Sequence, residues 1–396
     1  MSKAVQPDSM ITRVPVTRDY GTTVLRAARH RDCISQDVNA IALADELGKR
    51  PDVRVIAVLD AAGRPVGILQ KESLFALLGK PFGREVLGRT KASELAQTVP
   101  ILDSHTGLFA SGFEEQGEEE ASYRILVDGK GQFLAILAAR DLSEHLSRIT
   151  EDDIELAGKI QERLEASNEA ISGEDFRFEA WSRPAKGVGG DFWHSKRLES
   201  GSCFLALCDV SGKGVAASLV VALVAGMLRM YDFSKGLGSL IVALNEALVA
   251  TFHMEKYLTG FFCVFNPVSR MIEVADMGHS HAFVLRGGKV RRLKTGTTNL
   301  PIGVEPAMRP SLHRWILASG DALFVYSDGL TEQEDQSGKE FGDRHLASFV
   351  LGALGNDESL RETLPVALDN HRGRIPQQDD MSFMLLSLHE ASTGRS

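Results

Sequence analysis

Cysteine is scarce in this chain of 396 residues, and its four cysteines form no CxxC pair. A disulfide framework or a thiolate zinc site depends on paired cysteines, so neither is expected to organise the fold. The cysteines at positions 33, 203, 208 and 263 are instead expected to be buried thiols of a protein in the reducing cytoplasm.

Long apolar runs are also missing. The longest nearly apolar run, Val215 to Leu228, is shorter than the roughly 20 residues needed to span a bilayer. The first residues, MSKAVQPDSMITRV, lack the apolar core of a signal sequence. We therefore expect a soluble protein with no membrane partner.

Basic charge is in deficit, with 44 Lys and Arg against 53 Asp and Glu, a formal net charge of −9 and a pI near 5.7. Nucleic-acid phosphates require a basic face, so nucleic acid is not an expected partner. Kinase signatures, a GxGxxG loop or an HRD motif, and the GxSxG elbow of a serine hydrolase are absent as well. A small ligand or another protein is the more plausible partner.

Acidic residues do occur at the ends of strand-like apolar segments. They are Asp191 after Gly189-Gly190, Asp209 after SCFLALC, Asp328 in GDALFVYSDGLTE, and Asp379 or Asp380 before MSFMLLSL. Two unit charges 4 Å apart repel by about 4 kcal/mol at an effective dielectric near 20, so gathering such residues requires cations. Oxygen ligands without paired His or Cys favour Mg²⁺ or Mn²⁺ over zinc.

Seven segments in this order resemble the SpoIIE/RsbU-like branch of the metal-dependent protein phosphatases (PPM, protein phosphatase 2C). They are GVGGDFW, DVSGKGVAASL, ADMGHSHAFVL, LPIGV, GDALFVYSDGLTE, FGDRHL and QDDMSFMLL. The resemblance covers roughly residues 175 to 389 and implies an α-β-β-α sandwich with two metal ions between its sheets. It also implies a ligand set, in which Asp209 bridges the ions, Val210 lends its carbonyl, and Asp191, Asp328 and Asp379, or alternatively Asp380, complete the site.

The activity implied by this resemblance is hydrolysis of phosphoserine or phosphothreonine on a protein, by a water activated between two Mn²⁺ or Mg²⁺ ions. Asp209, Asp191 and Asp328 are the expected catalytic residues. The implied substrate is a phosphorylated regulatory protein of the anti-sigma antagonist type. His279 and His281 in GHSH are candidates for a general acid, although loop histidines are more often structural.

One position departs from the family pattern. The third residue after the first metal aspartate is commonly acidic, and here it is His194. Either this side chain lies outside the metal site, or it weakens the site. The second reading keeps an alternative open, in which the domain is an inactive phosphatase-like dimer that binds a nucleotide or a partner.

The N-terminal third contains an internal repeat with a period of about 69 residues. VIAVLDAAGRPVGILQKESL is followed by YRILVDGKGQFLAILAARDL, each within a strand, helix, strand, strand, helix pattern. This repeat resembles a pair of cystathionine-β-synthase (CBS) motifs, which implies an adenine nucleotide between the repeats. The acidic residues matching the ribose-binding position are Glu72 and Asp141. Alternatively, both only stabilise the N-terminal turns of their helices.

A helix is predicted from Asp141 to Ala166, since this stretch contains no proline and a single glycine. Its apolar positions, Leu142, Leu146, Ile149, Leu156 and Ile160, suggest a coiled-coil seam and hence a homodimer. A single amphipathic helix packed on its own chain is the alternative. The predicted organisation is an α/β multi-domain protein with an N-terminal arm (1–21), a CBS-pair-like α/β domain (22–140), a helical linker (141–172) and a phosphatase domain (173–396).

Overall fold

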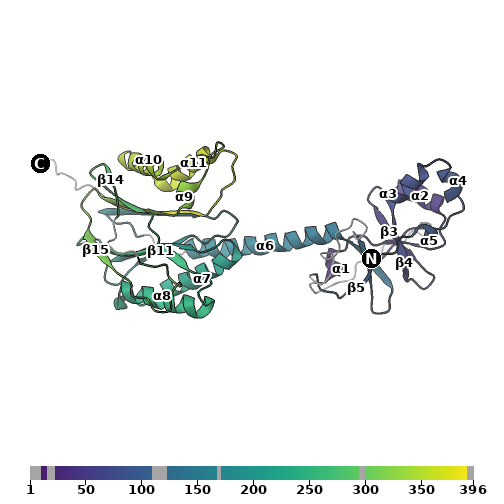
Figure 1. Ribbon diagram of the computed structural model, residues 1–396, viewed down its shortest axis with the longest axis horizontal. Coiled ribbons are helices and arrows are strands. Elements are labelled where there is room, and N and C mark those ends of the chain that lie inside the picture. The colour runs from purple at the N-terminus through teal and green to yellow at the C-terminus, as the bar shows by residue number, and fades with distance from the viewer. Residues whose placement is uncertain (1–9, 16–22, 109–122, 167–170, 294–298, 390–396) are drawn as a thin grey trace, which may run out of the picture. The chain divides into compact units, whose positions relative to one another are not determined.

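The computed structural model describes residues 10–15, 23–108, 123–166, 171–293 and 299–389. The chain folds as two compact units, Met1–Glu151 and Asp152–Ser396. The boundary between them falls inside helix α6 (Ala139–Ala166), which occupies most of the predicted linker. Figure 1 shows the elements of each unit.

The N-terminal unit is built from two similar halves. In each half two strands pair in parallel and the second of them forms an antiparallel hairpin that leads into a helix. The first half contains β2 (Asp32–Ser35), α2 (Ala40–Gly48), β3 (Val55–Leu59), β4 (Pro65–Gln70) and α3 (Lys71–Leu78). The second half contains β5 (Ile101–Asp103), β6 (Tyr123–Val127), β7 (Phe133–Ala138) and the start of α6.

The two hairpins share the same turn. Asp60 in the first and Asp128 in the second each accept two backbone N–H bonds from the following residues. A glycine with positive φ completes each turn, as its lack of Cβ permits. Aligning Asp60 with Asp128 gives a repeat period one residue shorter than the period predicted from the sequence. With this period Glu72 matches Arg140 rather than Asp141.

Part of the predicted N-terminal arm (1–21) belongs to the first sheet of the N-terminal unit. Strand β1 (Thr12–Arg13) pairs with β2, and Ile11 is buried. The remaining arm residues, 1–9 and 16–21, lie outside the described residues. Short helices complete the unit: α1 (Val24–Ala27), α4 (Gly83–Leu87) and α5 (Ala92–Leu95). Helix α1 is short because the chain after it enters the sheets, with His30 bridging to Ile136 and Asp32 pairing with Arg13.

The C-terminal unit contains two five-stranded antiparallel sheets. The first has the order β15-β12-β11-β10-β9, with bounds His313–Ile316, Met271–Met277, Leu258–Asn266, Cys203–Val210 and Phe192–Arg197. The second has the order β14-β13-β16-β17-β8, with bounds Lys289–Arg292, Ala282–Arg286, Ala322–Tyr326, Met381–Leu388 and Phe176–Arg183. Short alternating strands separated by turns predicted this antiparallel arrangement.

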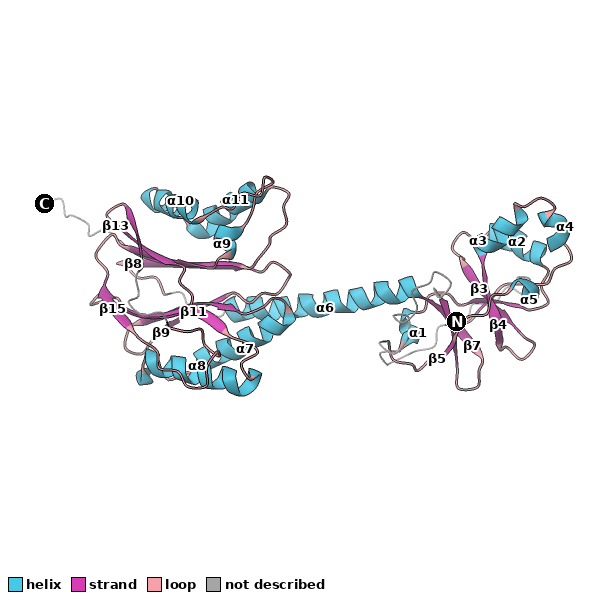
Figure 2. Ribbon diagram, in the orientation of Figure 1, coloured by secondary structure: helices cyan, strands magenta, loops and turns pink. Residues whose placement is uncertain are grey.

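The two sheets face each other, and helices cover their outer sides (Figure 2). Leu205, Leu207, Phe261 and Met384 belong to the apolar core between the sheets. Helices α7 (Val215–Met230) and α8 (Leu237–Phe252) pack on the first sheet. Helices α9 (Gly329–Glu332), α10 (Asp343–Gly355) and α11 (Leu360–Arg372) pack on the second. The predicted α-β-β-α sandwich is therefore confirmed for this unit.

Two sequence-level expectations can be compared directly with the described residues. The four cysteines are all buried and free, as predicted. Among the residues that the structure describes, no helix is both long and apolar enough to cross a membrane.

Candidate functional site

Strand alternation in the first sheet turns two aspartates toward the space between the sheets. In β10, Leu205 and Leu207 belong to the core between the sheets, and Asp209 follows them at the same two-residue spacing. Asp191 directly precedes β9, two residues before Trp193, which packs on that core. Both carboxylates therefore lie on the inner face of the first sheet.

The second sheet contributes two more carboxylates. Asp328 follows β16, and Asp379 precedes β17. These strands are antiparallel neighbours, with Tyr326 opposite Phe383, so the end of one and the start of the other lie at the same edge of the sheet. Ser382 Oγ then reaches across to the first sheet and donates a 2.7 Å hydrogen bond to Asp191 Oδ2.

The electrostatics confirm that these acids are close to one another. Burial and the negative charges of Asp328, Asp379 and Asp380 together raise the pKa of Asp209 to about 7. Burial, together with the neighbouring Asp209, raises the pKa of Asp191 well above its usual value. Without a cation the folded protein therefore disfavours the charged form of both side chains.

Three glycines leave room for polar groups around these acids. A Cβ on Gly189 would lie 2.6 Å from Asp380 Oδ2, and one on Gly190 would lie 2.7 Å from the Val210 carbonyl oxygen. A Cβ on Gly329 would lie 2.0 Å from the Asp380 carbonyl oxygen. The close approach predicted for the Gly189-Gly190 pair is thus present, and it brings the Val210 carbonyl beside the loop that carries Asp191.

Adjacent aspartates at the start of β17 have different partners. Asp380 Oδ1 accepts the Ala185 N–H at 2.8 Å, and its Oδ2 accepts the Gly190 N–H at 2.6 Å. Asp379 Oδ2 instead lies 2.7 Å from Lys213 Nζ. Asp380 is therefore engaged in holding the loop, whereas Asp379 has a partly exposed lysine as its charged neighbour.

The acids do not form a closed cage by themselves. Within the described ranges, no three His, Cys, Asp or Glu side chains are placed so that they could enclose a metal ion. Mg²⁺ commonly keeps several waters and takes only one or two carboxylates, so an open arrangement suits it. The all-oxygen donor set, the glycine-lined space and the raised pKa values together fit hard divalent cations.

The histidines singled out from the sequence have different environments. His194 is buried beside Phe204, on the face of β9 that packs on α7 and α8, and its Nε2 has no hydrogen-bond partner among the described residues. Burial lowers its pKa to about 4. His194 is therefore directed away from the inner face that carries Asp191.

His279 is buried, and its Nε2 lies 2.9 Å from the Tyr326 carbonyl oxygen, to which it donates as the neutral ring. Burial lowers the pKa of His279 to about 3, so this ring is neutral at pH 7. His281 is partly exposed and packs against Tyr326. Of the two general-acid candidates, only His281 is accessible.

Several residues near the acids were not identified from the sequence. They are Ser382, Lys213 and Gln161, of which Gln161 contacts the backbone on both sides of Gly190. Gln161 is a buried polar residue in an otherwise exposed stretch of α6, but a sequence pattern does not show which helix positions become buried. Gln161 bonds to backbone atoms, which every residue type has, so the residue types of its partners do not predict the contact.

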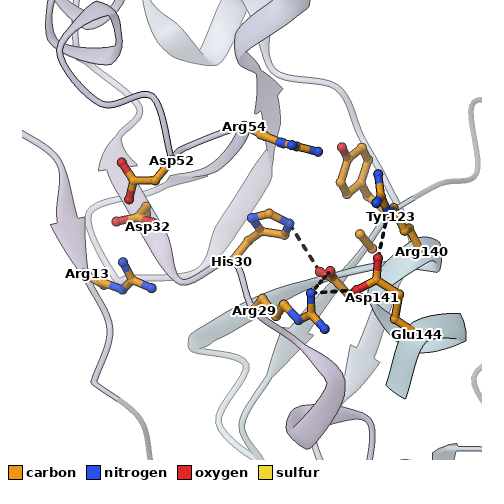
Figure 3. A pocket seen from close by; sticks show the side chains of 11 residues that line it. Arg13, Arg29, His30, Asp32, Asp52, Arg54, Tyr123, Arg140, Asp141 and Glu144 are labelled. Carbon is orange, nitrogen blue, oxygen red and sulfur yellow. Dashed lines mark hydrogen bonds and ion pairs between the residues drawn. The ribbon is translucent and has the colours of Figure 1, made fainter. Parts of the chain in front are cut away.

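The N-terminal unit contains a cavity of about 400 Å³ (Figure 3). It is lined by Arg13, Arg29, His30, Asp32, Asp52, Arg54, Tyr123, Ala138, Arg140, Asp141 and Glu144. Asp141 is buried in the first turn of α6. Its Oδ2 lies 3.3 Å from His30 Nε2 but accepts no hydrogen bond from the described residues. Glu72 is exposed on α3 and is not one of the lining residues. Of the two predicted nucleotide-binding acids, Asp141 is thus the one in a cavity.

Comparison with solved structures identifies the class of the C-terminal unit. The chain superimposes on the SiaA-PP2C domain of Pseudomonas aeruginosa with a TM-score of 0.52 at 18% identity, covering 61% of this chain and 98% of that domain. At this identity the likeness establishes the fold. The C-terminal unit therefore has the fold of a PP2C phosphatase domain.

Sequence comparison adds a family match and two relatives. Residues 199–389 match the family model of Stage II sporulation protein E (SpoIIE). The chain is 23% identical to protein IcfG of Synechocystis, over 72% of this chain and 51% of the relative. It is 24% identical to the phosphoserine phosphatase RsbU of Bacillus subtilis, over 47% of this chain and 55% of the relative. The chain thus spans about half the length of these curated relatives, and the region that matches the SpoIIE model lies within its C-terminal unit.

Proposed function

We propose that the C-terminal unit is a metal-dependent protein phosphatase that hydrolyses phosphoserine or phosphothreonine on a regulatory protein. The observation that carries this proposal is the gathering of Asp191, Asp209, Asp328 and Asp379 at one end of the facing sheets, with the pKa of Asp209 raised to about 7. Mutually repelling buried carboxylates destabilise a fold, and such clusters of groups with shifted pKa values are typical of functional sites. The relative RsbU, a phosphoserine phosphatase by name, supports the same activity.

In this proposal some residues hold the metal ions and others hold the loop around them. When bound, two Mn²⁺ or Mg²⁺ ions supply the positive charge that stabilises the transition state of phosphate-ester hydrolysis. Asp191, Asp209 and the Val210 carbonyl would hold them from the first sheet, and Asp328 and Asp379 from the second. Asp380, the alternative to Asp379 in the sequence prediction, would instead hold the loop through Ala185 and Gly190.

The test is hydrolysis of para-nitrophenyl phosphate by the full chain with Mn²⁺, with and without chelator, beside Asp209→Asn. We expect turnover that requires Mn²⁺ and disappears in Asp209→Asn, while the circular dichroism spectrum stays that of the wild type. Equal rates with and without chelator would contradict the proposal. A phosphoserine peptide and a phosphothreonine peptide then test the substrate class.

The alternative, an inactive phosphatase-like binding module, loses its main support. It depended on His194 weakening the metal site, but His194 packs beside Phe204 toward the helices. We also propose, from the family resemblance, that the phosphorylated substrate is a regulatory protein of the anti-sigma antagonist type. The N-terminal unit is proposed to control the phosphatase activity.

A second function is proposed for the N-terminal unit, namely that the paired repeats act as a CBS pair and bind an adenine nucleotide. The cavity supports it, because basic side chains could pair with phosphates and the buried Asp141 Oδ2 could accept a ribose hydroxyl. Titration calorimetry with AMP and ATP tests it, and Asp141→Asn should abolish the binding heat. Glu72→Gln, outside the cavity, is the matched control. Binding that is unaffected by Asp141→Asn would contradict this placement.

Homodimerisation through α6 is also proposed, with fewer apolar positions free for the contact than the sequence predicted. Leu142, Leu146 and Ile149 pack on the core of their own unit, which leaves Leu156 and Ile160 exposed by 59% and 49%. Light scattering should show a dimer that Leu156→Glu with Ile160→Glu dissociates, while Val366→Glu on α11 leaves it intact. A wild-type monomer at micromolar concentration would contradict the proposal.

A further inference from the structure

One face of α6 contacts the segment that leads to Asp191. Its residues, Ile154, Gly158, Gln161 and Glu165, follow helical spacing and differ from the apolar positions of the predicted seam. A Cβ on Gly158 would lie 2.6 Å from the Gly187 carbonyl oxygen, so the helix and the loop touch at the backbone. We call this set of four residues the docking face of α6.

Glu165 and Ile154 close the two ends of the docking face. The Glu165 carboxylate accepts the Ser182 Oγ hydrogen bond from β8, at 2.6 and 2.7 Å to its two oxygens. At the other end, the Ile154 side chain lies 2.9 Å from the position of a Cβ on Gly187, which has a positive φ of 79°. The helix is thereby held along the whole segment from Ser182 to Asp191.

Gln161 makes the central contact. Its Nε2 donates to the Asp191 carbonyl oxygen at 3.2 Å, and its Oε1 accepts the Gly189 N–H at 3.1 Å. The side chain is only 8% exposed, so these bonds are shielded from water. One amide group thus fixes the backbone on both sides of Gly190.

The same loop is held from the opposite direction by Asp380, which accepts the N–H groups of Ala185 and Gly190. The peptides of Gly189, Gly190 and Asp191 are therefore bonded alternately to α6 and to the start of β17. The position of the Asp191 carboxylate depends on both attachments.

We propose that Gln161 is a positioning residue for the metal centre, and that the docking of α6 on the loop sets the affinity of the site for divalent cations. This inference rests on the proposed function of the acids. It identifies the physical link through which a change in α6 reaches the carboxylates, namely two hydrogen bonds to the backbone of their loop. Glutamine suits this position because its amide both donates and accepts without charge, whereas glutamate would add a negative charge beside buried acids.

The experiment measures Mn²⁺ binding by titration calorimetry on the full chain, at a temperature where every chelated variant is folded by circular dichroism. Gln161→Met keeps the volume but removes both hydrogen bonds, and we expect its Mn²⁺ dissociation constant to rise about tenfold. Gln161→Glu keeps the acceptor for Gly189 and loses the donor, so its affinity should also fall. Arg163→Gln, exposed on the same helix, is the matched control and should bind as the wild type does.

Kinetics supply a second readout. If Gln161 acts through the metal site, raising Mn²⁺ should restore the rate of Gln161→Met toward the wild-type value, with the KM for the phosphopeptide unchanged. Wild-type affinity in both Gln161 variants would overturn the inference. A loss of rate that excess Mn²⁺ does not restore would overturn it as well. Absence of Mn²⁺ binding by the wild type would instead remove the proposed function, and this inference with it.

Discussion

Ser382 Oγ donates a 2.7 Å hydrogen bond to Asp191 Oδ2 across the space between the two sheets, joining residues 191 positions apart in the chain. Ser382 is fully buried in β17, and Asp191 is buried just before β9. The bond favours the charged form of a carboxylate whose burial raises its pKa. The two sheets that carry the proposed metal ligands are therefore tied to each other by a hydrogen bond that requires no cation.

Replacing Ser382 by alanine should weaken the metal site. Because the hydroxyl stabilises charged Asp191, its loss should raise the pKa of Asp191 further and reduce Mn²⁺ affinity at pH 7 by about fivefold. Calorimetric titration with Mn²⁺ measures this change. Ser387→Ala, on the same strand but bonded to the Arg177 carbonyl, is the control, and equal affinities in both variants would contradict the prediction.

Asp209→Asn should stabilise the chelated protein at pH 8 even though it removes activity. The pKa of Asp209 is raised from 3.8 to about 7, so its charge at pH 8 costs folding free energy, on the order of 4 kcal/mol. The gain should shrink as the pH falls from 8 to 5, because the wild-type side chain then takes up a proton in the folded state. Urea unfolding in chelator measures it. A variant less stable than the wild type at pH 8 would count against the raised pKa.

His194→Leu should reduce the sensitivity of the fold to acid. His194 has a pKa lowered to about 4 by burial, so below its ordinary value of 6.5 the unfolded chain binds a proton that the folded chain does not. This difference should lower the unfolding free energy of the wild type by about 2 kcal/mol between pH 8 and pH 5. The leucine variant should lose this part of the pH dependence, while His345→Gln, at an exposed position, should keep it. The same pH slope in all three proteins would contradict the prediction.

Gly158→Ala should destabilise the C-terminal unit although alanine favours helices. The added Cβ would lie 2.6 Å from the Gly187 carbonyl oxygen, and this backbone contact can be relieved only by moving α6 away from the loop. Gly226→Ala in α7 is the matched control, since its Cβ would meet nothing within 4 Å and should stabilise by up to about 1 kcal/mol. Thermal unfolding separates the two outcomes, and a stabilised Gly158→Ala would show that α6 does not dock as described.

The longer elements of both units could be predicted because their patterns are local. Alternation and turns predict β11, β12, β13, β14 and β16, and apolar periodicity predicts α7, α8, α10 and α11. Strand β15 (HRWI) and helix α9 (GLTE) were missed because four residues carry too little periodicity. The predicted seam on α6 was misjudged in part, because Leu142, Leu146 and Ile149 pack on their own unit.

The acids of the candidate site were predictable from their positions at strand ends, but their partners were not. Asp379 and Asp380 are adjacent in the sequence, and only the fold shows that Asp380 binds the loop N–H groups while Asp379 pairs with Lys213. Gln161 contacts main-chain atoms some 30 positions away, and such contacts place no requirement on the partner's side chain.

The division of labour between these adjacent aspartates depends on the register of β17. Met381 pairs with Arg183 on one side, and Phe383 pairs with Tyr326 on the other, so the strand cannot slide without breaking both ladders. Deleting one residue just before the pair would keep both aspartates in the chain but shorten the approach to the strand. An insertion or deletion here should therefore displace both aspartates at once, whereas a single substitution alters only one of the two roles.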